Sequence, residues 1–197
     1  MPIKAEREYR SAQEFRAADN EEYIVEGYAS TFSPYCMYEY EGIKYMEEID
    51  RHAFDDADMS DVIMQYDHCG RVFARNNKTK TLKIDIDDIG LHIRADLSKT
   101  DGAKDLYQDI ASGLITQMSF AFRVEEDSYN QETHTRRILK IKKVYDVSAV
   151  SIPANPGTAI SARDYFSGLA EMEKAQTESP NPMLAKLIEN FRARHGL

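Results

Sequence analysis

The sequence predicts a β-rich α+β fold: a mostly antiparallel β-barrel surrounded by helices, followed by a C-terminal helical tail. Two observations support this prediction. Several short segments either alternate apolar with polar residues or concentrate aromatic and β-branched residues, and both patterns are typical of strands. Only one long helical pattern separates these segments, whereas a doubly wound parallel sheet would need a helix after nearly every strand. No glycine-rich phosphate-binding motif is present.

The first strand is predicted at residues 23–32, which are rich in aromatic and β-branched residues. A tyrosine-rich loop is expected to follow at 33–49, because Ser33-Pro34 and Gly42 are turn signals. Asp50 is expected to cap a short helix that extends to Asp58.

A second group of strands follows. The apolar run 61–66 predicts a strand that ends at Asp67-His68 and so delivers a histidine at its C-terminal edge. Residues 82–86 and 91–97 alternate apolar with polar side chains on either side of Asp88-Ile89-Gly90, which predicts a hairpin with one face toward solvent.

A helix is predicted at 103–111, with Thr100 or Ser98 as its N-cap and Gly113 as its stop signal. The next strand, 115–124, places Met118, Phe120 and Phe122 on its core side. The alternation therefore leaves Ser119 on the less apolar face.

A polar loop is expected at 125–135, followed at 136–152 by one long strand or by two strands joined at a bend near Tyr145. The pattern becomes helical from Asp164, and residues 177–182 indicate a linker before an amphipathic tail helix at 183–195. We therefore expect one domain at 1–163 and a helical tail at 164–197.

The composition excludes several classes of function. The net charge is −9, and no stretch concentrates Lys and Arg, so a nucleic-acid partner is not expected. No run approaches the roughly 18 apolar residues of a membrane span, and the N-terminus lacks the apolar stretch of a signal peptide, so a cytosolic protein without a membrane partner is expected.

The sequence calls for no cofactor and no metal. Cys36 and Cys69 lack zinc-ligand spacing and are interpreted as free thiols. The aspartates before Gly90 resemble half of a calcium loop, but Ile89 stands where an oxygen ligand is needed, so they are interpreted as the polar face of the hairpin.

Three residues could form a Ser–His–acid set: His68 at a strand end, Ser119 on a strand and Asp146 within an apolar and basic segment. Each also has a simpler interpretation, and the pattern alone leaves both open. Ser119 could be a small polar residue facing solvent, His68 could be satisfied by Asp67, and Asp146 could pair with a nearby cation. Those cations are Lys142, Lys143 and Arg137.

The order of motifs resembles the prohead (capsid maturation) protease family of tailed phages. The most specific pieces are MSFAF and the later block DVSAVSIPANP, which follow GYASTF, YMEEIDRHAF, QYDH and DDIGLHIRADL. The resemblance covers roughly residues 22–162. His52 stands where the family usually has glycine, and the segment after His68 is not typical.

The resemblance implies a serine endopeptidase with a fold similar to that of the herpesvirus assemblin proteases. It implies that His68 is the general base, Ser119 the nucleophile and Asp146 the third member of the triad. We also expect substrate to bind as an extended strand beside Ser119.

The resemblance further implies substrates and location. The substrates would be the scaffold protein, or a scaffold-like segment of the capsid protein, inside the procapsid in the bacterial host cytoplasm, together with the protease itself. A homodimer is implied only by analogy with assemblins. The alternative function is a non-catalytic capsid-assembly or scaffold module that retains the protease fold.

Overall fold

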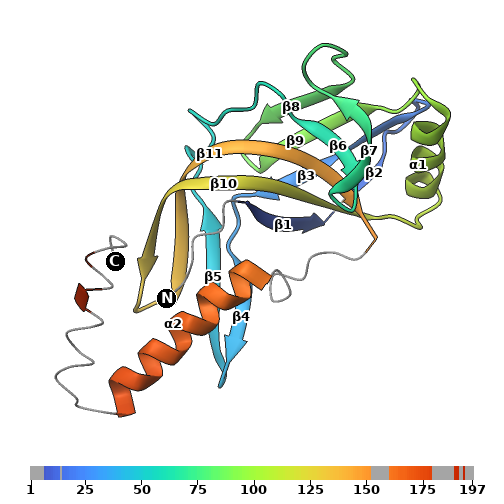
Figure 1. Cartoon of the computed structure of the whole chain (residues 1–197). Helices are drawn as coiled ribbons and strands as arrows, with labels where there is room; N and C mark the ends of the chain where they lie inside the picture. The colour runs from blue at the N-terminus through green and yellow to red at the C-terminus, as the bar shows by residue number, and fades with distance from the viewer. Residues whose placement is uncertain (1–6, 14, 152–159, 179–188, 191–192, 194–197) are drawn as a thin grey trace.

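The computed structural model describes residues 7–13, 15–151, 160–178, 189–190 and 193, and the statements below concern these residues. The chain forms two β-sheets and two helices, α1 (Asp101–Ala111) and α2 (Ile160–Glu178) (Figure 1). The larger sheet has seven strands: β1 (Glu8–Gln13), β4 (Tyr35–Tyr40), β5 (Ile43–Ile49), β6 (Ile63–Tyr66), β7 (Cys69–Arg75), β10 (Gln117–Asn130) and β11 (Thr135–Val150). The smaller sheet has four: β2 (Phe15–Ala17), β3 (Ile24–Thr31), β8 (Leu82–Ile86) and β9 (Gly90–Asp96).

The sheets are open, so the prediction of a closed barrel is wrong, although the β-rich class is confirmed. The reason lies in β11, which is long enough to pair with two different strands on the same side. Its first part runs parallel to β5 and its last part runs parallel to β6. The larger sheet therefore branches at β11 instead of closing.

The main hydrophobic core lies between the two sheets. One face of β10 contributes Met118, Phe120 and Phe122, each with no exposed surface, as the alternation predicts. Phe120 and Phe122 stack with their ring centroids 4.4 Å apart. The smaller sheet contributes Val25 and Ile93 from the opposite side. Ser119 lies between Met118 and Phe120 on β10, so its side chain points to the opposite face of the sheet, away from this core.

Helix α1 follows the predicted pattern. The Thr100 hydroxyl accepts a hydrogen bond from the Ala103 N–H at 3.2 Å, which identifies Thr100 as the N-cap. Ala103, Leu106 and Ile110 are buried on one side of the helix. Gly113 follows the C-cap with φ +80°, a conformation that glycine adopts without strain.

The tyrosine-rich segment is a hairpin, β4–β5, and the loop expected there is wrong. Glu41 and Gly42 both have positive φ, as a two-residue hairpin turn requires. The hairpin buries Met37 and Tyr45 against α2, which lies along β4 (Figure 1). The hairpin and α2 thus share a second, smaller hydrophobic cluster.

Helix α2 is confirmed as a helix but begins at Ile160, before the expected Asp164. The Glu173 carboxylate fixes it on the sheet, because it accepts hydrogen bonds from the Tyr45 hydroxyl at 2.9 Å and from the Tyr129 hydroxyl at 3.1 Å. The predicted linker and tail helix at 177–195 fall almost entirely outside the described residues. Neither described helix is long and apolar enough to cross a membrane.

Three further expectations differ from the structure. The segment after Asp50 forms turns rather than a helix, because the Asp50 carboxylate accepts from the His52 N–H at 2.8 Å and closes the chain locally. The polar segment 125–135 is mostly strand, since β10 continues to Asn130. The strands β1, β2 and β7 were not predicted at all.

Candidate active site

The fold brings His68, Ser119 and Asp146 together from three separate elements. The His68 Nε2 atom lies 2.7 Å from the Ser119 Oγ atom, and the His68 Nδ1 atom lies 2.5 Å from the Asp146 Oδ1 atom. Ser119 belongs to β10 and Asp146 to β11, while His68 occupies the turn between β6 and β7. The imidazole therefore bridges a hydroxyl and a carboxylate, an arrangement that can accept a proton from oxygen and stabilise the resulting imidazolium.

The turn that carries His68 is strained. Asp67 and His68 are its two central residues and have φ of +49° and +57°, a combination that two-residue hairpin turns need but that glycine and asparagine adopt more readily. The Asp67 carboxylate holds the turn in place by accepting from the Ser151 N–H and hydroxyl, both at 2.8 Å. Asp67 thus bonds to Ser151, and the interpretation of His68 as a loop histidine satisfied by Asp67 is wrong.

A β-bulge orients Asp146. In the β10–β11 ladder Ala121 pairs with Asp146, but the next residue, Phe122, pairs with Val144, so Tyr145 is an extra residue on β11. Directly paired residues share a face of the sheet, and neighbours along a strand lie on opposite faces. The extra residue therefore places Asp146 on the face opposite Val144, which is the face of Ser119.

Ser148 completes the hydrogen bonding of Asp146. It pairs directly with Ser119 across the strands, and its hydroxyl donates to the Asp146 Oδ1 atom at 2.7 Å. Ser119, Asp146 and Ser148 are all fully or almost fully buried, whereas the His68 side chain is 14% exposed. The interpretation of Ser119 as a solvent-facing serine is therefore wrong, and solvent reaches the group through His68.

The interpretation of Asp146 as the partner of a nearby cation is also wrong. Lys143 pairs with Asp58 at 2.7 Å, and Arg137 pairs with Asp50 at 2.6 Å. Asp146 is left with His68 and Ser148 as its hydrogen-bond partners among the described side chains.

Strand β1 adds to the site a side chain, Tyr9, that no motif or pattern in the sequence predicted. Tyr9 packs edge-on against the His68 ring, with the ring centroids 4.6 Å apart. Strand β1 lies beside β10 in the register Ser11 to Ser119, and β11 occupies the other side of β10. Both hydrogen-bonding edges of β10 are therefore occupied at Ser119, by β1 and by β11. The expectation that substrate adds as a strand beside Ser119 is wrong.

A buried ionic cluster fixes β1 from the opposite face. It consists of Glu8, Arg10, Glu47, Asp127 and Arg136, and each of these side chains is at most 6% exposed. Arg10 bonds to Glu47 and Glu8 at 2.5 and 2.6 Å, and Arg136 bonds to Asp127, Glu8 and Glu47 at 2.7, 2.9 and 3.0 Å. Burial raises the pKa of Glu8, but the charges of Arg136 and Arg10 outweigh burial and lower it to about 2.

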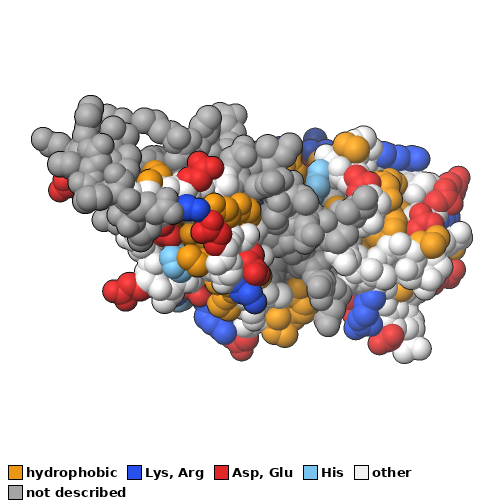
Figure 2. Space-filling model, turned by 90° about the horizontal axis from the view of Figure 1, so that it is seen from below, with side chains coloured by type: hydrophobic (Ala, Val, Ile, Leu, Met, Phe, Trp, Pro, Cys, Tyr) orange, Lys and Arg blue, Asp and Glu red, His pale blue; other side chains and the backbone are white. Residues whose placement is uncertain are grey.

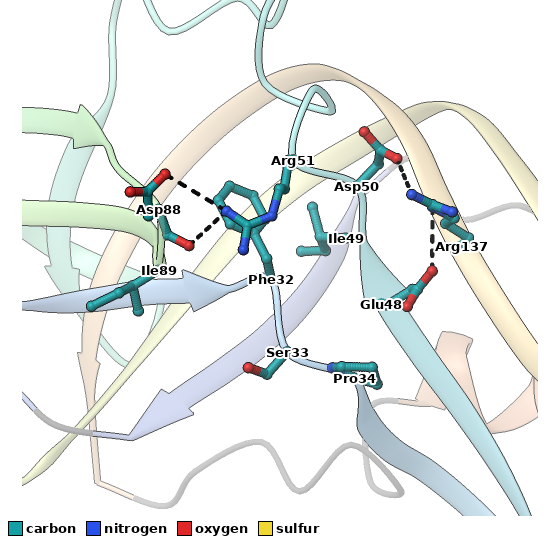
Figure 3. Close-up of a pocket in the computed structure, with 10 residues that line it drawn as sticks. All are labelled: Phe32, Ser33, Pro34, Glu48, Ile49, Asp50, Arg51, Asp88, Ile89 and Arg137. Carbon is teal, nitrogen blue, oxygen red and sulfur yellow. Dashed lines mark hydrogen bonds and ion pairs between the residues drawn. The ribbon is translucent and has the colours of Figure 1, made fainter.

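The structure also contains a cleft of about 490 Å³ away from these residues (Figure 3). Its two arginines already have partners. Arg51 donates to the Asp88 carbonyl oxygen at 2.9 Å, and Arg137 pairs with Glu48 and Asp50. No residue of the His68 group lines this cleft, and no group of His, Cys, Asp and Glu in the described part of the chain could hold a metal ion. Asp87 in particular closes the β8–β9 turn, by accepting from the Gly90 N–H at 3.0 Å.

Comparison with known proteins gives one family. A search of curated proteins and a search of solved structures each gave no match. The family model described as caudovirus prohead serine protease matches residues 9–174 of the 197 in the chain. The matched range includes Tyr9, the three residues of the hydrogen-bonded group and most of α2. This chain belongs to the caudovirus prohead serine protease family, whose members are the proteases of phage capsid maturation.

Proposed function

We propose that this protein is a serine endopeptidase in which Ser119 is the nucleophile, His68 the general base and Asp146 the residue that orients His68. The observation that carries the proposal is the continuous hydrogen bonding from the Ser119 hydroxyl through the His68 ring to the Asp146 carboxylate. Its substrates are the scaffold protein, or a scaffold-like segment of the capsid protein, inside the procapsid, and the protease itself.

The mechanism follows from the need to activate a weak nucleophile. As the Ser119 Oγ atom attacks the scissile carbonyl carbon, the His68 Nε2 atom accepts the hydroxyl proton. His68 then donates that proton to the leaving amine, which departs and leaves an acyl group on Ser119. Water, deprotonated by His68, hydrolyses the acyl group and restores the free serine.

Asp146 keeps the His68 Nδ1 atom protonated, so that the Nε2 atom is free to accept the proton from Ser119. It also stabilises the imidazolium that forms during attack. The Ser148 hydroxyl occupies a second lone pair of the same Oδ1 atom, which limits the orientations of the carboxylate. Because Ser119 is buried, the scissile carbonyl must approach from the side on which His68 is partly exposed.

The decisive experiment is an intact-mass time course of the purified wild-type protein beside Ser119→Ala, at low and at high protein concentration. A matched control is Ser128→Ala, which removes a serine further along the same strand. We expect wild type and Ser128→Ala to lose mass and Ser119→Ala to stay whole. A fluorophosphonate probe should label the wild type and Ser128→Ala but not Ser119→Ala.

Each other result has a clear meaning. Equal shortening of wild type and Ser119→Ala would refute Ser119 as the nucleophile. Absence of both shortening and labelling in the wild type, when purified scaffold is also supplied, would favour the non-catalytic assembly module. Circular dichroism of each variant shows that a lost activity does not reflect unfolding.

A further inference from the structure

Three cationic side chains lie together on the face of the larger sheet that carries Ser119. Arg123 follows Ser119 by four residues on β10, and its direct partner on β11 is Lys143. Arg7 lies just before β1, and its guanidinium carbon sits 4.0 Å from the centre of the Tyr145 ring. The Lys143 Nζ atom is 5.9 Å from the centre of the same ring. We name Arg7, Arg123 and Lys143 the cationic row.

The row is unfavourable as a purely structural feature. Like charges at directly paired positions of neighbouring strands repel each other, so the Arg123–Lys143 pair costs stability. Lys83 and Arg94 on β8 and β9 are also directly paired cations, but there Arg94 forms ion pairs with Glu21 and Glu26. On the face shown in Figure 2, basic and acidic side chains are interspersed. The whole chain is also acidic, with a net charge of −9, so this local group of cations is opposite in sign to the net charge of the protein.

Arg123 is the member that is available to a ligand. It is exposed, and its side chain makes no ion pair, hydrogen bond or ring contact with the described residues. Lys143 is engaged by Asp58 at 2.7 Å, and the Arg7 guanidinium rests on Tyr145. An arginine fork without a partner, flanked by two more cations, is complementary to a carboxylate.

The position of the row relates it to the scissile bond. Residues on a strand advance by about 3.3 Å each, so Arg123 lies about 13 Å from Ser119 along β10. Tyr9, Ala121 and Tyr145 occupy the sheet between them, and none of these carries a charge. An extended polypeptide that crosses this face also advances by about 3.3 Å per residue.

We propose that the cationic row is a substrate subsite for an Asp or Glu side chain located about four residues from the scissile bond. This inference rests on the proposed function, because it takes Ser119 as the point of cleavage. The subsite would select polypeptide segments with an acidic residue on one side of the cleavage point.

The first test measures binding without cleavage. In the Ser119→Ala background, fluorescence anisotropy follows a labelled peptide of alternating Glu and Ala, with a Gln-for-Glu peptide as the neutral probe. We expect the acidic peptide to bind more tightly than the neutral one, with the difference shrinking as salt increases. Because the protein carries a net negative charge, its overall electrostatic potential alone would make the acidic peptide bind more weakly than the neutral one.

Two charge reversals locate the binding. Arg123→Glu should weaken binding of the acidic peptide about tenfold, which is near the effect of removing one attraction and adding one repulsion. Lys83→Glu, on the smaller sheet, changes the net charge equally and should leave binding unchanged. Equal binding of the two peptides would overturn the subsite. An equal loss of affinity for the acidic peptide in Arg123→Glu and Lys83→Glu would also overturn it. Because this test requires no cleavage, its failure leaves the triad to be judged by the mass time course.

The second test uses the active enzyme on a mixture of peptides from a digested proteome, with cleavage sites read by mass spectrometry. We expect Asp and Glu to be enriched about four residues to one side of the cleaved bond, and Arg123→Glu to abolish that enrichment while cleavage continues. An unchanged acidic preference in Arg123→Glu would also overturn the subsite.

Discussion

The buried ionic cluster that anchors β1 should dominate the stability of the larger sheet, and Arg136→Met tests this. Arg136 pairs with three carboxylates, those of Glu8, Glu47 and Asp127, and after the substitution Arg10 still pairs with Glu8 and Glu47. Removing one partner of a buried ion pair typically costs 3–5 kcal/mol. We expect the free energy of unfolding to fall by about 4 kcal/mol, which moves the urea midpoint down by about 2 M.

The loss should depend on pH in a defined direction. The pKa of Glu8 is lowered to about 2 in the folded protein, against an ordinary value of 4.5. A lowered carboxyl pKa contributes stability that is fully present above the unfolded value and is lost as the pH falls toward the folded value. Glu8 therefore contributes about 3 kcal/mol above about pH 5, and this decreases between about pH 4.5 and pH 2.

Arg136→Met removes the stronger of the two charges that lower the Glu8 pKa. The variant's Glu8 should therefore titrate at a higher pH, and the stability difference between wild type and variant should narrow as the pH falls from about 5 to about 3. The measurement is urea unfolding followed by circular dichroism at several pH values in that range.

Arg137→Met is the matched control, because Arg137 is the next residue on β11 but its side chain is 52% exposed. Its pairs with Glu48 and Asp50 lie at the surface and should contribute at most about 1 kcal/mol. A loss below about 1 kcal/mol in Arg136→Met, or a loss that stays constant from about pH 7 to about pH 3, would refute this account of the cluster.

Three further predictions concern single contacts. Ser148→Ala removes a hydrogen bond to the charged Asp146 and should lower kcat/KM about tenfold, whereas Ser148→Thr should retain activity; equal rates in wild type and Ser148→Ala would contradict this. Gly90→Ala would place a methyl group on the Ser30 carbonyl oxygen and should lower the free energy of unfolding by more than about 2 kcal/mol, measured in urea; an unchanged midpoint would contradict the close packing. Glu173→Ala removes the acceptor that fixes α2 and should speed amide hydrogen exchange in that helix alone; unchanged exchange there would show that apolar contacts suffice.

Local patterns in the sequence were enough to predict two of the three residues' positions. A strand at 61–66 that delivers His68 just beyond its end follows from a short apolar run, and a strand with Ser119 on the face opposite the phenylalanines follows from alternation; both are present. The same reasoning predicted the β8–β9 hairpin and the Thr100 cap of α1. These features depend only on neighbours in the chain.

Features that depend on distant partners could not be predicted. The face on which Asp146 lies is decided by the Tyr145 bulge, and only the bend near Tyr145 was expected from the sequence. The burial of Tyr45 requires α2, whose Glu173 lies 128 residues further along the chain. Closure of the sheet depended on which strands β11 pairs with, and alternation carries no information about pairing partners.

Three structural features at the site each cost stability, which supports the proposal that the hydrogen bonds among His68, Ser119 and Asp146 serve catalysis. The turn at His68 uses positive φ at two residues that lack glycine's freedom. The bulge at Tyr145 interrupts the β10–β11 ladder, and the site buries the polar side chains of Ser119 and Asp146. A chance contact between a serine and a histidine would need none of these. Their convergence on one chain of hydrogen bonds is what a selected proton-transfer site requires.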